Sequence, residues 1–375
     1  MTAMTPPAPI PLTILTGFLG SGKTTLLNRL LKDPALQDTV VIMNEFGEIG
    51  LDHLLVETVD EGMVLLSAGC LCCTVRGDLI ATLEDLLRKR DNDRILPFKR
   101  VIIETTGLAD PAPILHAVLY HPYLSMRYAV EGVVTVVDAV NGSATLDAHR
   151  EAVKQAAVAE RIVIAKTDLV QDPEALARLR ERLHQLNPGA ALLEADASTE
   201  AIISGGLFGL DGKIADVAEW LKTEAVEEAE RESHAHQHGH HHHGHDHHHD
   251  VNRHDESIRA FCLTSDQPIR QGTLDMFLDL LRSSQGAKLL RVKGLVALAE
   301  DPEHPVVIHG VQHVVHVPAV LPRWPSEDRR SRIVFIVDGL ERETVEKLWN
   351  AFLGKPAVDQ PDAAALSDNP LSLRR

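Results

Sequence analysis

The stretch Gly17-Phe18-Leu19-Gly20-Ser21-Gly22-Lys23-Thr24 decides the fold. It matches the phosphate-loop pattern G-x-x-x-x-G-K-[S/T] at every fixed position, and it lies between an apolar run, 12–16, and a helical pattern, 25–31. Glycines let several backbone N–H groups point at one phosphate, and the following helix adds its positive N-terminal end. The stretch therefore predicts a nucleoside triphosphate site rather than a chance glycine-rich turn.

Different residues of this loop are expected to contact the phosphates and Mg²⁺. Lys23 would reach the β- and γ-phosphates as a catalytic cation, and the Thr24 hydroxyl would bind Mg²⁺. The remaining contacts to the nucleotide are expected from Gly17, Gly20, Ser21, Gly22 and Thr25.

A second apolar run ends at Glu104 and continues as Thr105-Thr106-Gly107. At the carboxyl edge of a sheet, Glu104 would hold Mg²⁺ through water or orient the attacking water. Gly107 would offer a backbone N–H to the γ-phosphate, and the loss of that contact on hydrolysis would make a switch. The alternative is a core strand that ends in an exposed glutamate.

Ala165-Lys166-Thr167-Asp168, at another strand end, resembles the guanine-reading sequence N-K-x-D. Asp168 would accept hydrogen bonds from guanine N1 and N2, a donor pair that adenine lacks, and the Lys166 stem would lie along the base. Ala165 replaces the usual Asn, which predicts a loss of about 1 kcal/mol of affinity. The pattern favours guanine nucleotides and disfavours a kinase or an ATPase.

Three of the four cysteines are close together, at Cys70, Cys72 and Cys73. Thiolates bind Zn²⁺, Co²⁺ or Cu⁺ and do not suit Mg²⁺. A fourth position would stay open for water, a carboxylate such as Glu45 or a donor from another protein, and an incomplete site suits metal transfer better than structural zinc. A redox pair and small buried side chains are the alternatives.

The stretch Asn44-Glu45-Phe46-Gly47-Glu48 follows the second apolar run, in the place of a first switch loop. Glu45 and Glu48 would contact Mg²⁺, a second metal ion or only solvent. The sequence does not choose among these three roles.

A histidine-rich tract between His234 and His254 holds twelve of the 21 histidines. It is expected to bind several divalent ions weakly, with an affinity that falls as the pH drops through the imidazole pKa near 6.5. Its internal position and irregular spacing disfavour an engineered tag. A passive metal store with a vestigial nucleotide site is therefore an alternative function.

The composition suits a globular protein of two domains, because 375 residues with 44% apolar content can fill two cores. The net charge of −17 gives a surface that repels nucleic acid and anionic membranes, so neither is expected as a partner. The sequence shows no secretory signal pattern and no apolar run near the roughly 20 residues of a membrane span. A cytoplasmic location is expected.

Apolar runs alternate with helical patterns in the first part of the chain, as in an α/β protein with a mostly parallel sheet. The expected parts are a nucleotide-binding domain over 1–222, an acidic and then histidine-rich flexible linker over 223–256, a smaller α+β domain over 257–355 and a loose tail over 356–375. Strands are expected at 12–16, 40–44, 63–66, 101–104, 133–138, 162–165, 191–194, 257–263, 288–296, 306–309, 311–317 and 332–337. Helices are expected at 25–31, 78–90, 148–158, 173–186, 214–221, 274–282 and 341–352.

Together these motifs resemble the CobW family of metal-trafficking GTPases, of the type called zinc-regulated GTPase metalloprotein activators. The matching pieces are Gly17–Thr24, Asn44–Glu48, Gly69–Cys73, Glu104–Pro111, Val133–Asp138, Lys166–Asp168, the histidine-rich linker and Leu289–Gly294. Within the family, the chain looks closer to the YjiA-like branch than to the cobalamin-pathway branch.

The resemblance implies a P-loop GTPase domain and a CobW C-terminal domain, with slow, Mg²⁺-dependent hydrolysis of GTP to GDP and phosphate. It also implies Zn²⁺ at Cys70, Cys72 and Cys73, and a zinc metallochaperone in which GTP gates loading and release to a client metalloprotein. A cobalt chaperone for cobalamin synthesis or a cobalt enzyme is the alternative. Met43 replaces a glutamate of some relatives, so a carboxylate ligand would be missing there. The client and any homo-oligomer stay open.

Overall fold

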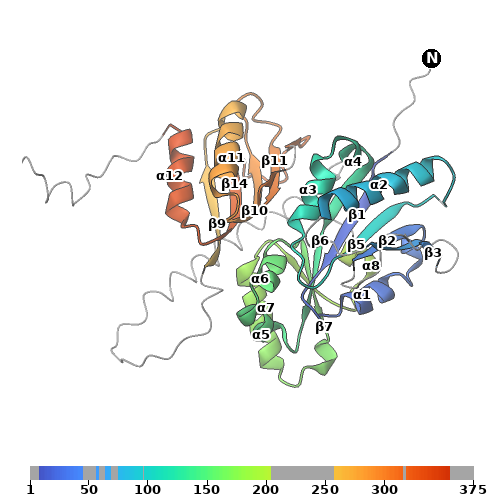
Figure 1. Cartoon of the computed structure of the whole chain (residues 1–375). Helices are drawn as coiled ribbons and strands as arrows, with labels where there is room; N and C mark the ends of the chain where they lie inside the picture. The colour runs from blue at the N-terminus through green and yellow to red at the C-terminus, as the bar shows by residue number, and fades with distance from the viewer. Residues whose placement is uncertain are drawn as a thin grey trace, which may run out of the picture.

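The computed structural model describes residues 8–44, 56–58, 64–68, 75–95, 97–203, 257–315 and 318–354. They form two sheets, an eight-stranded one in the first part of the chain and a six-stranded one in the second. Figure 1 shows the two parts side by side, each with its own helices. The predicted fold class, a P-loop α/β domain followed by a smaller α+β domain, is confirmed.

The first sheet has the strand order β3-β4-β2-β5-β1-β6-β7-β8 and is parallel except for β3, which pairs antiparallel with β4. Its strands are β1 (Ile10–Thr16), β2 (Thr39–Asn44), β3 (Val56–Thr58), β4 (Val64–Ala68), β5 (Arg100–Glu104), β6 (Tyr128–Asp138), β7 (Arg161–Ala165) and β8 (Ala191–Glu194). Helices cover both faces, which is why strands such as β7 are buried along their whole length. Seven of these strands were predicted, and β3, only three residues long, was missed.

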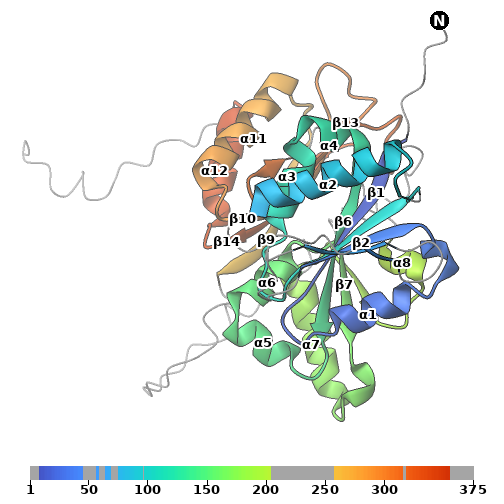
Figure 2. The same cartoon turned by 45° about the vertical axis from the view of Figure 1, so that its right-hand side comes forward.

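The helices of the first domain lie on both faces of this sheet. They are α1 (Lys23–Leu30), α2 (Val75–Asp91), α3 (Ala112–Tyr120), α4 (Pro122–Arg127), α5 (Gly142–Ala148), α6 (Arg150–Ala157), α7 (Pro173–Leu186) and α8 (Thr199–Ile203). Figure 2 shows α1 and the group α2, α3 and α4 on opposite sides of the sheet. The helix predicted over 148–158 is present as α6, which begins after His149, where the backbone is extended (φ −133°, ψ 108°); α5, on the other side of His149, was not predicted. The helix predicted over 214–221 lies outside the described residues.

The second domain is an antiparallel sheet with two helices. Its elements are β9 (Ile258–Ser265), α11 (Gln271–Gln285), β10 (Leu289–Val296), β11 (Val306–Val311), β12 (Val314–Val315), β13 (Ala319–Val320), β14 (Ser331–Asp338) and α12 (Arg342–Phe352). The helices pack on the sheet around Phe277, Phe335 and Trp349. The continuous strand predicted over 311–317 is wrong, because the chain turns at Gln312, where φ is 53°, and only β12 follows. No helix among the described residues is long and apolar enough to span a membrane.

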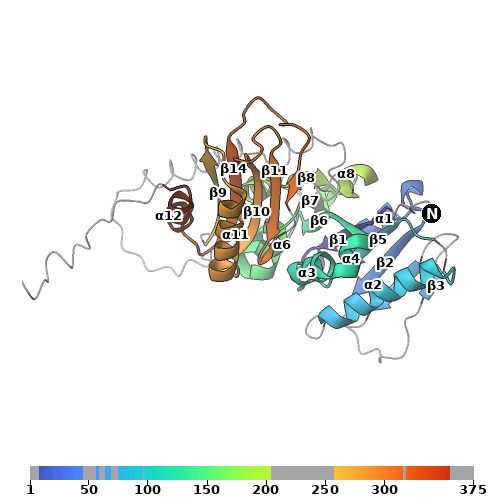
Figure 3. The same ribbon diagram turned by 90° about the horizontal axis from the view of Figure 1, so that it is seen from above.

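The two domains share apolar cores. Leu290 and Ile336 of the second sheet pack with α6 and α7, and Val311 joins the core beneath α2 and α3. Figure 3 shows α12 on the side of the second sheet that faces away from the first domain, so the other face of that sheet supplies these contacts. The domains are therefore joined by buried surface and not only by the connecting chain.

A buried ion pair crosses this interface. Arg291, on β10, is 1% exposed and donates hydrogen bonds to the Val158 carbonyl and to the Glu160 carboxylate, which is 6% exposed. The other Glu160 oxygen accepts a hydrogen bond from the backbone N–H of Val133 on β6. Lys293 donates to the Gly189 carbonyl at 3.1 Å. The family-like segment 289–294 thus holds the second domain to the first.

We expect Arg291→Met to lower the free energy of unfolding by about 3–5 kcal/mol, because it leaves the Glu160 carboxylate buried without its cation. Urea unfolding measures this loss, and adding Glu160→Gln to Arg291→Met should recover part of it. Arg259→Met is the matched control, because Arg259 pairs with Glu341 on the surface and should cost under about 1 kcal/mol. Equal losses in the two single variants would contradict the assignment.

Candidate nucleotide site

The loop between β1 and α1 has the backbone that the glycine pattern predicts. Gly17, Gly20 and Gly22 all have positive φ, at 141°, 72° and 102°, a region that favours glycine. A Cβ atom on Gly17 would also lie 2.4 Å from the Val136 carbonyl oxygen. The loop is therefore a glycine-only turn against β6, and its shape fits a phosphate cradle.

Lys23 is folded back over this loop. Its ammonium group donates to the carbonyls of Gly17 at 2.8 Å and Phe18 at 3.1 Å, and the residue is only 9% exposed. The pKa of Lys23 lies below its usual value because burial disfavours the charged amine, while the nearby Glu104 carboxylate acts in the opposite direction. Here the two backbone carbonyls accept the hydrogen bonds of this amine. A bound phosphate would accept them instead and would add a negative charge.

The predicted magnesium ligands come together from two elements. The Thr24 hydroxyl, in the first turn of α1, donates a hydrogen bond to the Glu104 carboxylate at the end of β5, at 2.8 Å. The strands bring them together, because β1 and β5 are parallel neighbours with Leu15 opposite Glu104. A hydroxyl and a carboxylate are oxygen ligands that suit Mg²⁺, so the residues fit this ion.

The loop that follows Glu104 packs tightly against the phosphate loop. A Cβ atom on Gly107 would lie 2.5 Å from the Leu19 backbone nitrogen and 2.7 Å from its Cα. The structure thus places Gly107 beside the phosphate loop. It also adds a residue that the sequence analysis missed, because Gln155 of α6 donates to the carbonyls of Gly107 at 3.2 Å and Ala109 at 3.0 Å.

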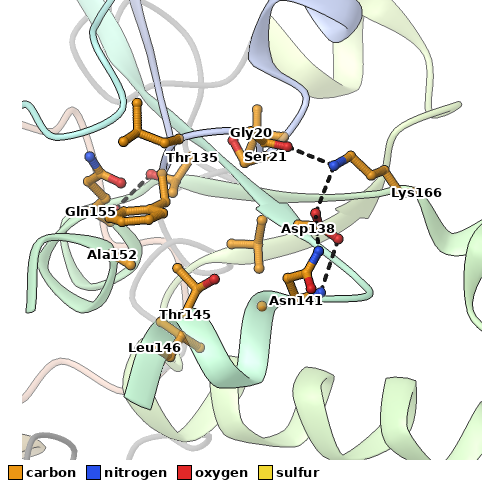
Figure 4. Close-up of a pocket in the computed structure, with 15 residues that line it drawn as sticks. Gly20, Ser21, Thr135, Asp138, Asn141, Thr145, Leu146, Ala152, Gln155 and Lys166 are labelled. Atoms are coloured by element: carbon orange, nitrogen blue, oxygen red, sulfur yellow. Dashed lines mark hydrogen bonds and ion pairs between the residues drawn. The ribbon is translucent and has the colours of Figure 1, made fainter. Parts of the chain in front are cut away.

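Lys166 ties the guanine-type motif to the phosphate loop. Its ammonium group donates to the Gly20 carbonyl and to the Asp138 carboxylate, both at 2.7 Å, as Figure 4 shows. Asp138 also accepts backbone hydrogen bonds from Val140 and Asn141. Burial alone raises the pKa of Asp138, but the hydrogen bonds from Lys166, Asn141 and Val140 outweigh it and hold the pKa below its usual range. The sequence analysis predicted a strand that ends at Asp138 but assigned this residue no role.

Of the other predicted site residues, the structure describes some and leaves others outside the described ranges. Asp168 lies exposed in a short 3-10 turn (Thr167–Leu169) after Lys166, and Thr25 is exposed in the first turn of α1. Ser21 is buried in the loop. Glu45, Glu48, Cys70, Cys72, Cys73 and the histidine-rich tract lie outside the described residues. Among the residues that are described, no group of three or more potential metal ligands is present.

A cavity of about 310 Å³ lies behind the phosphate loop (Figure 4). Phe18 to Ser21, the end of β6, α5, Gln155 and Lys166 line it, whereas Lys23, Thr24 and Glu104 do not. Gln155 and Lys166 lie at opposite sides of this space. The cavity separates α5 and α6 from the back of the loop that would hold the phosphates.

A phosphate loop after the central strand, with a carboxylate at the end of the neighbouring strand, defines a P-loop nucleotide-binding protein. The family model described as CobW/HypB/UreG, nucleotide-binding domain, matches residues 11–194, and the cobalamin synthesis protein cobW C-terminal domain matches 258–353. The chain belongs to the CobW family, as the motifs predicted.

Two curated relatives and one solved structure illustrate the similarity. The chain is 32% identical to the zinc chaperone YjiA of Escherichia coli over 337 residues, which cover 90% of this chain and 96% of YjiA. It is 37% identical over 193 residues to the zinc-regulated GTPase metalloprotein activator 1 of Schizosaccharomyces pombe, covering 50% and 46% of the two chains. The crystal structure of Zn(II)-bound YjiA GTPase from E. coli matches with a TM-score of 0.65 and 29% identity, covering 92% and 99%.

We expect Gly107→Ala to reduce nucleoside triphosphate turnover at least about tenfold, because the added methyl group would push against the Leu19 backbone. Phosphate release measures turnover. Gly272→Ala is the control, because in the described part of the chain a Cβ at Gly272 in α11 would meet no atom within 4 Å outside its chain neighbours and its own helix backbone. Unchanged turnover in Gly107→Ala would show that the two loops do not have to pack as they do here.

Proposed function

We propose that the chain is a GTP-hydrolysing zinc metallochaperone. The Thr24–Glu104 contact carries this proposal, because it joins the phosphate loop to the strand end that would sense the γ-phosphate. Membership of the CobW family supports GTPase activity, and relatives named as zinc chaperones support zinc as the cargo. The acceptor would be a client metalloprotein, and the predicted cytoplasmic location is part of the proposal.

In the proposed mechanism each described site residue has a task in hydrolysis. Lys23 would neutralise charge on the β- and γ-phosphates, and Gly107 would donate its backbone N–H to the γ-phosphate. Thr24 and Glu104 would hold Mg²⁺, which supplies charge stabilisation to the phosphates when bound. Glu104 would also orient the attacking water.

Guanine selection is proposed to rest on Asp168, with Lys166 held in place by Gly20 and Asp138. Asp168 is exposed in the turn that follows β7, and its carboxylate would accept hydrogen bonds from guanine N1 and N2. In this proposal Asp138 does not contact the base. It accepts a hydrogen bond from Lys166 and so holds the lysine side chain beside the base.

We expect Asp168→Asn to lower GTP affinity about 10- to 100-fold, because the base loses hydrogen bonds to a charged acceptor. The amide can instead donate to the carbonyl that xanthine carries in place of the guanine 2-amino group, so affinity for xanthosine triphosphate should rise. Competition against a fluorescent GDP analogue measures both. If Asp168→Asn left the preference for GTP over xanthosine triphosphate unchanged, Asp168 would not be the base reader.

Zinc is proposed to bind as cargo at Cys70, Cys72 and Cys73. The observation that supports coupling to the nucleotide is the strand pairing at this edge of the sheet. Ala68, the last residue of β4, lies opposite Asn44 of β2, and the neighbouring Met43 lies opposite Glu104. The chain therefore leaves the sheet, just before the cysteines, at the same edge as the proposed magnesium ligands.

We expect zinc affinity to differ about tenfold or more between complexes with Mg²⁺ plus a non-hydrolysable GTP analogue and with GDP, as coupled sites require. Chelator competition measures this in a variant that lacks residues 234–254, so that the histidine-rich tract does not contribute. Replacing Cys70, Cys72 and Cys73 with Ala should abolish the tight site.

Each part of the proposal has a result that would contradict it. Full zinc affinity in the triple cysteine variant would remove the site assignment. Equal zinc affinities in the two nucleotide states would favour storage over transfer, whereas GTP turnover that is lost in Lys23→Ala would exclude a vestigial nucleotide site. Cobalt as the cargo remains the alternative, and at equal geometry thiolate ligands favour Zn²⁺ over Co²⁺.

A further inference from the structure

Gln155 is a buried polar residue that the proposed chemistry does not use. It lies on α6, is 1% exposed, and donates from its side-chain amide to the carbonyls of both Gly107 and Ala109. Two acceptors on one short loop fix which end of the amide faces that loop, because the amide oxygen would be repelled there. Gln155 thus holds the backbone of the segment that would approach the γ-phosphate.

The helix that carries Gln155 also contacts the phosphate loop itself. His149, the residue before α6, stacks on Phe18 with ring centroids 4.3 Å apart. The backbone carbonyl of Gln155 accepts a hydrogen bond from the Thr135 hydroxyl of β6 at 2.7 Å. This bond anchors the helix to the sheet (Figure 4). Helix α6 and the residue that precedes it therefore contact both loops that would enclose the phosphates, α6 through Gln155 and the preceding residue through the His149 ring.

The second domain packs against the side of α6 that faces its sheet. The apolar side of the helix, which includes Val153 and Ala156, packs in one core with Leu290 and Ile336 of the second sheet. Polar contacts reinforce this at both ends of the helix, where Arg150 pairs with Asp338 and the Val158 carbonyl accepts from Arg291. Because α6 is fixed on two sides, the Gln155 amide is held at a set distance from the loop.

We propose that Gln155 is a positioning residue for GTP hydrolysis, which sets the Gly107–Ala109 loop so that the Gly107 N–H faces the γ-phosphate. It acts through that backbone and makes no contact with the nucleotide. The proposal rests on the GTPase activity proposed above and adds a residue from a different element. It predicts that Gln155 matters most in the GTP state, since GDP lacks the phosphate that this loop contacts.

The test removes the Gln155 amide group while keeping the side chain close to its original size. Gln155→Met keeps an unbranched side chain and removes the donor, and Gln155→Glu keeps the shape but sets a carboxylate against two carbonyls. Both should lower kcat about tenfold or more, with GDP affinity within about threefold of the wild type. Both should also lower the affinity for a non-hydrolysable GTP analogue relative to GDP. Should Gln155→Met fail to fold, Gln155→Asn, whose amide is too short to reach both carbonyls, takes its place.

Asn187 supplies the matched control. It is a buried amide that donates to the carbonyls of Ala156, Ala157 and Ala159, at the far end of the same helix, and it does not contact the nucleotide loops. Asn187→Leu should lower the Tm as much as Gln155→Met but leave kcat within about threefold of the wild type. Equal losses of kcat in the two variants, or unchanged kcat and analogue preference in Gln155→Met, would overturn the proposal.

Lys23→Ala separates this inference from the proposed function. Turnover that is lost in Lys23→Ala and retained in Gln155→Met would overturn only the role of Gln155. Turnover that persists in Lys23→Ala would overturn the GTPase mechanism, and the ratio of analogue to GDP affinity would still report on Gln155. A wild-type chain that binds no guanine nucleotide would overturn both.

Discussion

The parallel pairing of β1 with β5 on one side and β6 on the other determines where the residues of the candidate site lie. The parallel register sets Leu15 opposite Glu104 and Thr16 opposite Thr135, so β1 and β5 end at nearly the same level and β6 continues past them to Asp138. Hydrogen bonds from Thr105 to the Leu15 carbonyl and to the Thr16 hydroxyl continue this pairing into the loops. The phosphate loop consequently meets the acidic strand end directly, through Thr24 and Glu104, and the Lys166 side chain connects the loop to Asp138 at the end of β6.

The glycines convert this meeting of strands into a site of defined shape. Gly17 is pressed against β6 and Gly107 against the backbone of Leu19, so neither position has room for a side chain. Close contact between backbones leaves the polar groups of Lys23, Thr24 and Glu104 to meet over a small space. The chemistry of the site therefore depends on the absence of side chains at two positions as much as on the presence of charged ones.

The sequence predicted those parts of the site that lie within local patterns. The phosphate loop and the end of β5 were found because glycine spacing and apolar runs are local features, and their contact follows from parallel pairing. Gln155 and Asp138 were missed because their partners lie far along the chain, and neither has a motif of its own. Helix α5 was missed because it has only seven residues and buries only Gly142 and Leu146, which leaves almost no apolar periodicity to detect.

The Arg291–Glu160 pair has a consequence for the order in which the chain is made. Glu160 belongs to the part that leaves the ribosome first, and its buried carboxylate receives its cation only from a residue more than a hundred positions later. A nascent first domain would have to keep that carboxylate hydrated or protonated until β10 arrives. The interior of the nucleotide-binding domain is therefore completed by the domain translated after it, and a prematurely terminated chain would carry an unfinished core.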